Sequence, residues 1–161
     1  MSTVPIARSA LTTQIVTYLV DALKPAEILV GRGLAPAAGG WDKGQPGTSG
    51  FVKYVTLKTG NAVTPSQGEP NPVGRTRASW DVSYQLTSVG AMESHADDTG
   101  DQVRFVIVDL PKEFTLRGFH WTLQQVRTLR LGPTIRNDST DPAFWEVTDD
   151  VSLQLSLDRT P

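Results

Sequence analysis

Two segments of the chain repeat apolar residues at the three- and four-residue spacing of an amphipathic helix. The first lies between Pro5 and Pro25, and the second runs from Met92 to Leu110 and stops before Pro111. Acidic residues in the first half of the second segment favour a helix start there, because they offset the helix dipole. We therefore predict two helices that pack on a core. For the first helix, core packing is favoured over contact with a membrane or a partner helix.

In other segments the pattern changes to the alternation of a half-buried strand. It is clearest near the C-terminus, where Val151, Leu153 and Leu155 alternate with polar residues. We expect the second and third strands to pair as a hairpin. The predicted strands are 27–30, 51–59, 78–89, 119–131 and 145–157.

Glycine and proline interrupt these patterns in two long stretches, 31–50 and 60–74. Both are predicted to be loops without regular structure, and Gly132 with Pro133 is predicted to open a turn. Ordered loops of this length often serve an interface. Trp41, in the middle of the first loop, either folds back on the body of the protein or anchors a partner, as tryptophans at binding hot spots do.

The predicted elements follow the order helix, three strands, helix, two strands, without an internal repeat. Two amphipathic helices over one face of a sheet bury all the apolar stripes together. We therefore expect an α+β fold, with a mostly antiparallel β-sheet, two amphipathic helices packed on one face, and long Gly/Pro-rich loops. With 161 residues, the chain is expected to form a single domain over 1–161.

Composition narrows the classes of function. The chain has 15 basic and 17 acidic residues and a net charge of −2, which argues against an autonomous duplex-DNA binder. It has no cysteine, which excludes disulfides, thiolate zinc sites and cysteine nucleophiles. The sequence contains no export signal and no apolar stretch long enough to span a bilayer, so we expect a soluble, unprocessed protein.

Few residues offer catalytic chemistry. One cluster has the composition of an oxygen-rich metal site: His95, Asp97, Asp98 and Asp101. Its spacing matches no metal motif, and an acidic helix start explains it better. His120 lies among aromatic residues with no evident nucleophile partner, and no phosphate-binding glycine motif occurs. We expect no enzyme, metal or cofactor; a metal-dependent hydrolase at the acidic cluster is the alternative.

Arginines gather around the predicted strands and their turns. Single arginines in such places are usually solvated or paired with acids. Repeated by symmetry in a ring, they would instead form a charged surface that faces a partner or a polyanion. The six are Arg75, Arg77, Arg117, Arg127, Arg130 and Arg136.

The segment 80–104, WDVSYQLTSVGAMESHADDTGDQVR, resembles the tail terminator (tail-completion) proteins of long-tailed bacteriophages, most of all the actinobacterial phage type. The resemblance lies in a strand that ends Y-Q-L-T-S-V-G and a following helix with acidic residues and a D-Q-V-R ending. The order of the other predicted elements is similar too, so the resemblance covers most of the chain. Two features depart from it: the long loop around Trp41 and the more acidic helix at Asp97 and Asp98.

The resemblance implies a structural virion protein, assembled in the host cytoplasm and located at the head-proximal end of the tail. Such proteins form a hexameric ring that caps the tail tube, stops its polymerisation and docks the head-side connector (stopper) protein. The implied partners are further copies of the chain, the tail tube protein and the connector. DNA would pass through the lumen without specific binding, and no membrane is involved. A head–tail connector or adaptor, another minor tail protein, and a binding module unrelated to virions are the alternatives.

Loops and strand edges are the expected contact sites, because such a protein works by shape and contact. Proline lowers the entropy that a loop loses when a partner orders it, so we expect the two proline-rich loops to make axial contacts. The predicted interface residues are Trp41, Pro46, Pro65, Pro70, Pro72, Arg75, Arg77, Arg130 and Arg136.

Overall fold

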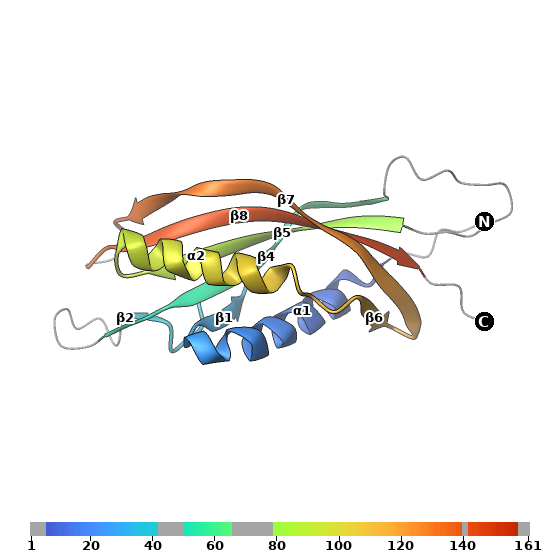
Figure 1. Ribbon diagram of the computed structural model, residues 1–161, viewed down its shortest axis with the longest axis horizontal. Helices are drawn as coiled ribbons and strands as arrows, with labels where there is room; N and C mark the ends of the chain where they lie inside the picture. Colours follow the sequence, from blue (N-terminus) through green and yellow to red (C-terminus); the bar gives the residue numbers. More distant parts are fainter. Residues whose placement is uncertain (1–5, 42–49, 66–78, 140–141, 158–161) are drawn as a thin grey trace, which may run out of the picture.

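The computed structural model describes residues 6–41, 50–65, 79–139 and 142–157, which form two α-helices, a short 3₁₀ helix and eight strands (Figure 1). The helices are α1 (Arg8–Leu23), η1 (Lys24–Ala26) and α2 (Glu93–Ile107). The strands are β1 (Leu29–Arg32), β2 (Gly40–Trp41), β3 (Phe51–Val52), β4 (Tyr54–Pro65), β5 (Ser79–Gly90), β6 (Glu113–Leu116), β7 (Phe119–Asn137) and β8 (Phe144–Leu157).

Six strands form one sheet in the order β1-β4-β5-β8-β7-β6, and β2 pairs with β3 separately. Only the β1–β4 pair is parallel; the other neighbours in the sheet are antiparallel. The sheet curls strongly, because the start of β7 bends and brings β6 beside α1 (Figure 1). There the Gln14 side chain donates a hydrogen bond to the Thr115 carbonyl, at 2.8 Å.

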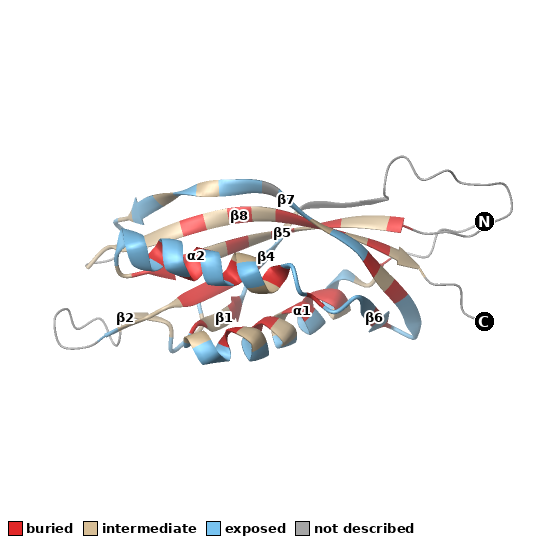
Figure 2. Ribbon diagram, viewed as in Figure 1, coloured by how far each residue is buried: buried red, intermediate tan, exposed pale blue. Residues whose placement is uncertain are grey.

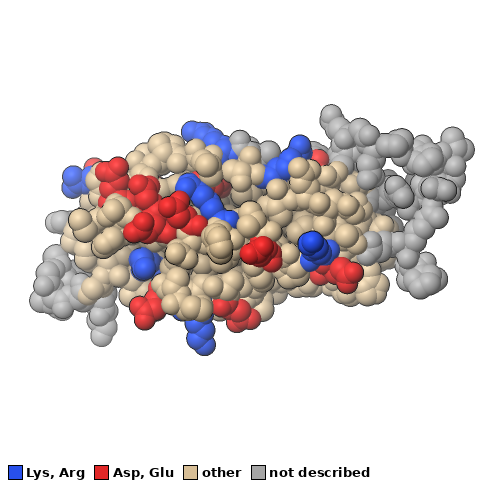
Figure 3. Space-filling view, viewed as in Figure 1, with Lys and Arg blue, Asp and Glu red and all other residues tan. Residues whose placement is uncertain are grey.

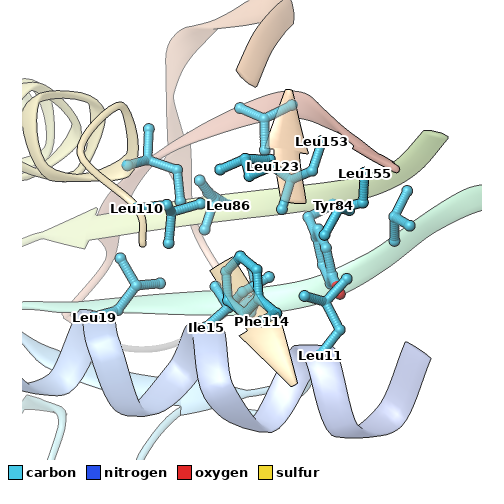
Figure 4. Close-up of a cluster of buried hydrophobic side chains, with 14 of the residues drawn as sticks. Leu11, Ile15, Leu19, Tyr84, Leu86, Leu110, Phe114, Leu123, Leu153 and Leu155 are labelled. Carbon is cyan, nitrogen blue, oxygen red and sulfur yellow. The ribbon is translucent and has the colours of Figure 1, made fainter. Parts of the chain in front are cut away.

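Both helices cover the same face of the sheet, and the core lies between them and it (Figure 2). Each helix buries one stripe of side chains and leaves its outer side exposed. The buried side chains of α1 meet those of the central strands (Figure 4). This core contains Leu11, Ile15 and Leu19 from α1, Val103 and Ile107 from α2, Tyr84 and Leu86 from β5, Phe114 from β6, and Leu153 and Leu155 from β8.

One polar contact is built into this core. The hydroxyls of Thr12 on α1 and Tyr84 on β5 lie 2.9 Å apart, and both residues are buried. The Thr12 hydroxyl also donates to the Arg8 carbonyl, so the Tyr84 hydroxyl donates to Thr12. Burial raises the pKa of Tyr84.

We expect Tyr84→Phe to lower the free energy of unfolding by about 1 kcal/mol at neutral pH, since it removes one buried hydrogen bond. The folded protein holds the Tyr84 proton more tightly than the unfolded chain does. The stability that the protonated Tyr84 hydroxyl contributes is therefore fully present below the pKa of tyrosine in the unfolded chain, about 10. It is lost as the pH rises through the higher pKa of Tyr84 in the folded protein. Urea denaturation of both proteins at pH 7 and above pH 10 checks this; a stability difference that does not narrow with pH would contradict it.

The structure confirms the main sequence predictions. The fold is α+β, with a mostly antiparallel sheet and both helices on one face. The two predicted helices and the C-terminal strand are present close to their expected bounds. The predicted hairpin is present as well, since β4 pairs antiparallel with β5.

Several local predictions are wrong. The first strand begins at Leu29 and not at residue 27, because Glu27 adopts a left-handed φ of 57° where η1 ends. The stretch 31–50 is not all loop, since β1 reaches Arg32 and Gly40–Trp41 pairs with Phe51–Val52. The second predicted loop is shorter than expected, because β4 continues from the predicted end at residue 59 to Pro65.

The predicted turn at Gly132 and Pro133 is also wrong, because β7 runs through both residues to Asn137. The pairing of β7 with β8 is irregular at these two residues, since its register shifts between Leu131 and Thr134. Proline is tolerated at a bulge on an edge, where its missing N–H leaves no partner unpaired. The four-residue strand β6 was not predicted.

Candidate interaction surfaces

The longest strand, β7, has an outer edge that the described part of the chain leaves largely uncovered. β6 pairs with β7 over Phe119–Thr122, the Leu123 N–H donates to the Lys112 carbonyl just before β6, and beyond that point β7 pairs only with β8. Figure 2 shows most of this strand as exposed. On the part of β7 beyond β6, two apolar side chains face solvent: Leu131 is 57% exposed and Ile135 is 50% exposed. Natural proteins rarely leave a long strand edge with apolar side chains open unless another chain uses it.

A buried ion pair fixes the second half of β7 to the rest of the molecule. The Asp149 carboxylate on β8 is only 3% exposed, and it accepts hydrogen bonds from Arg104 Nε at 2.7 Å and Nη2 at 2.9 Å. It also accepts one from the Gly132 N–H at 3.1 Å. These bonds raise the pKa of Arg104. One carboxylate therefore joins α2, β8 and the irregular part of β7.

A second contact joins β7 to α2 at the surface. The Thr134 hydroxyl on β7 donates to the Asp97 carboxylate on α2. Asp97, Asp98 and Asp101 are exposed, and acidic side chains gather over the first half of α2 (Figure 3). The Asp101 carboxylate lies 3.2 Å from Arg104 Nη1. Asp97 therefore helps to hold β7 in place, whereas the acidic residue in the first turn of α2, where it offsets the helix dipole, is Glu93.

The sheet face opposite the helices is polar and open. Hydroxyl pairs bridge neighbouring strands there, with Thr87 and Thr148 at 3.0 Å and Ser79 and Ser156 at 3.5 Å. The side chains that form these pairs are short. It is a second surface on which a partner protein could lie, but its polar character gives it no preference for one partner.

An apolar groove lies at the opposite edge of the sheet from β7, where the end of α1, β1 and β3 meet. Its volume is about 640 Å³. Apolar side chains form most of its lining, and Val20, 44% exposed, is one of them. Acidic and basic residues are also part of the lining. The lining residues are Val20, Asp21, Lys24, Glu27, Ile28, Leu29, Val30, Pro36, Phe51, Val52 and Lys53.

The predicted interface residues that the structure describes lie in different parts of the molecule. Trp41 is half-buried and packs edge-to-face on Phe51, with ring centroids 5.1 Å apart, as its fold-back interpretation expects. Arg130 and Arg136 are exposed on β7, and Arg136 lies 2.8 Å from Asp138. Pro65 ends β4. Pro46, Pro70, Pro72, Arg75 and Arg77 lie outside the described residues.

The histidines stand apart from these surfaces. His95 is exposed on α2 and His120 is exposed on β7, where its Nδ1 lies 3.1 Å from the Thr115 hydroxyl. In the ranges that the structure describes, no three acidic, histidine or cysteine side chains are placed to hold a metal ion. None of the described helices is long and apolar enough to cross a membrane.

Comparisons with known proteins give information on the fold alone. No protein-family model matches the chain. No curated protein matches it. A solved structure of a protein without a descriptive name is similar over 98% of this chain and 99% of its own, with a TM-score of 0.50 and 16% identity. At that identity the likeness shows the fold alone, and it spans nearly the whole chain.

Proposed function

We propose that this protein is a tail terminator of a long-tailed bacteriophage. It forms a ring at the head-proximal end of the tail tube, stops polymerisation of the tube and presents the surface on which the head-side connector docks. It acts through contacts between proteins and has no catalytic role. DNA passes through the ring without sequence-specific contacts.

The edge of β7 that the described residues leave uncovered carries the proposal. A domain of this kind that acts alone would be expected to cover or shorten such an edge, whereas a ring subunit uses one edge to contact the next copy. The segment that resembles tail terminators, 80–104, supplies the central strand β5 and most of α2, so the resemblance concerns the centre of the fold. The near-zero net charge suits a lumen through which DNA slides without being held.

Growth of tail tubes in the presence of this protein tests the proposal. The tail tube protein of the same phage is polymerised with and without this chain, and tube lengths and ends are measured by negative-stain electron microscopy. We expect shorter tubes with a ring at one end; an unrelated protein of equal mass serves as the control. Unchanged tubes together with tight binding to the head-side connector would overturn the terminator role in favour of an adaptor.

A further inference from the structure

We propose that the apolar groove beside β1 is the docking site for β7 of a second copy of this chain, with Ile135 as the side chain that enters it. The contact joins opposite edges of two molecules head to tail. The inference deepens the proposed function and rests on it only because a ring-forming terminator must self-associate.

The position of the two surfaces favours a second copy as the occupant. Across the sheet, Ile135 pairs with Glu146, which pairs with Val89, which pairs with Tyr54. Tyr54 in turn pairs with Leu29, one of the residues that line the groove. Ile135 and the groove therefore lie at the same level on opposite edges of one sheet. Figure 1 shows β7 along one long side of the molecule and β1 with α1 along the other.

Strand polarity is compatible with this contact. β1 runs parallel to β4, and β4, β5, β8 and β7 alternate in direction, so β1 and β7 run in opposite directions. A copy moved sideways across the sheet places its β7 antiparallel to β1. The N–H groups of Leu29 and Gly33 donate toward β4, at 3.0 Å to the carbonyl of Lys53, just before the strand, and at 2.8 Å to that of Leu57. Since backbone groups alternate in direction along a strand, those of Val30 and Arg32 point away from β4.

The chemistry of the two surfaces matches as well. The groove is apolar inside and has two carboxylates and two lysines among its lining residues. Ile135 on β7 lies between Arg130 and the ion pair that Arg136 forms with Asp138, just after the strand. Apolar anchors can thus be buried while charged groups of opposite sign meet at the rim, the common arrangement of stable interfaces.

A head-to-tail contact has a structural consequence. Because the two contacting surfaces differ, a growing assembly keeps a free groove at one end and a free β7 edge at the other, and addition continues until the ring closes. A two-fold contact of β7 with β7 would instead stop at a dimer.

The absence of cysteine makes the contact testable by disulfide formation, which requires Cα atoms within about 7 Å. Val20→Cys protein and Ile135→Cys protein are mixed, with and without tube protein, and oxidised with glutathione disulfide. We expect a disulfide-linked dimer from the mixture and none from either variant alone. A double Val20→Cys/Ile135→Cys variant is expected to give a ladder that ends at the ring size.

The control is Phe105→Cys, at an apolar residue of α2 that is 73% exposed and therefore more accessible than Val20 or Ile135. Its mixture with Val20→Cys should stay unlinked. We also expect Ile135→Asp to weaken self-association at least about tenfold, while Phe105→Asp leaves it unchanged.

Linkage of Ile135→Cys with itself, or no linkage in the mixture under either condition, overturns the proposed contact. If tubes are capped without this linkage, the contact is wrong and the terminator role stands. If the linkage forms and tubes grow unchanged, the contact stands and the terminator role is wrong.

Discussion

Arg104→Met is expected to lower the free energy of unfolding by about 3 kcal/mol, because it leaves the Asp149 carboxylate buried without its cation. For a chain of this size the loss corresponds to a fall of roughly 6–12 °C in melting temperature. The remaining hydrogen bond from the Gly132 N–H does not supply a charge. Urea denaturation followed by circular dichroism measures the effect.

Two further variants show whether the stability lost in Arg104→Met comes from the unpaired Asp149 charge or from lost side-chain packing. Asp101→Asn removes the exposed carboxylate on the same arginine, at 3.2 Å, and should cost less than about 0.5 kcal/mol. The double variant Arg104→Met/Asp149→Leu removes both charges and should regain a large part of the lost stability, since an apolar pair often replaces a buried ion pair at little cost. A double variant no more stable than Arg104→Met alone would assign the loss to packing.

Gly132→Ala is expected to cost about 3 kcal/mol although it adds a single methyl group. A Cβ at this position would lie 2.0 Å from the Thr148 carbonyl oxygen, which is backbone and moves only if β8 moves. The shift also breaks the hydrogen bond from the Gly132 N–H to Asp149. Because this site holds the second half of β7, the same variant should also lose self-association.

Gly50→Ala is the matched control, since nothing lies within 4 Å of a Cβ at Gly50. It should change stability by less than about 0.5 kcal/mol. Hydrogen exchange of β7 amides locates the effect: in Gly132→Ala we expect faster exchange from residue 130 to 137, with β5 unchanged. Equal stability of the two glycine variants would contradict the close approach of β7 to β8.

The sequence predicted the fold where hydrophobic periods were long. Helices α1 and α2 and strand β8 each repeat their pattern over more than ten residues, which settles both type and position. Two-residue strands such as Gly40–Trp41 have no period to detect. β6 is missed for a similar reason, since Phe114 and Leu116 give only two apolar positions after a proline.

The candidate site was predicted less well. The strand alternation that places Val147 and Val151 inside also places Asp149 inside, so a buried charge was detectable from the sequence. Its partner Arg104 was not, because no spacing relates α2 to β8. The groove could not be predicted from the sequence either, because three separate segments of the chain form it. Gly132 and Pro133 signalled a break, and only the bulged edge of β7 explains why the strand continues.

The mass of the assembly in solution tests the central claim most directly. Light scattering is measured for the protein alone and after the tail tube protein is added. We expect a species with the mass of six copies of the 17.5 kDa chain, either free or at tube ends. A monomer under both conditions that leaves tube growth unchanged would contradict the account.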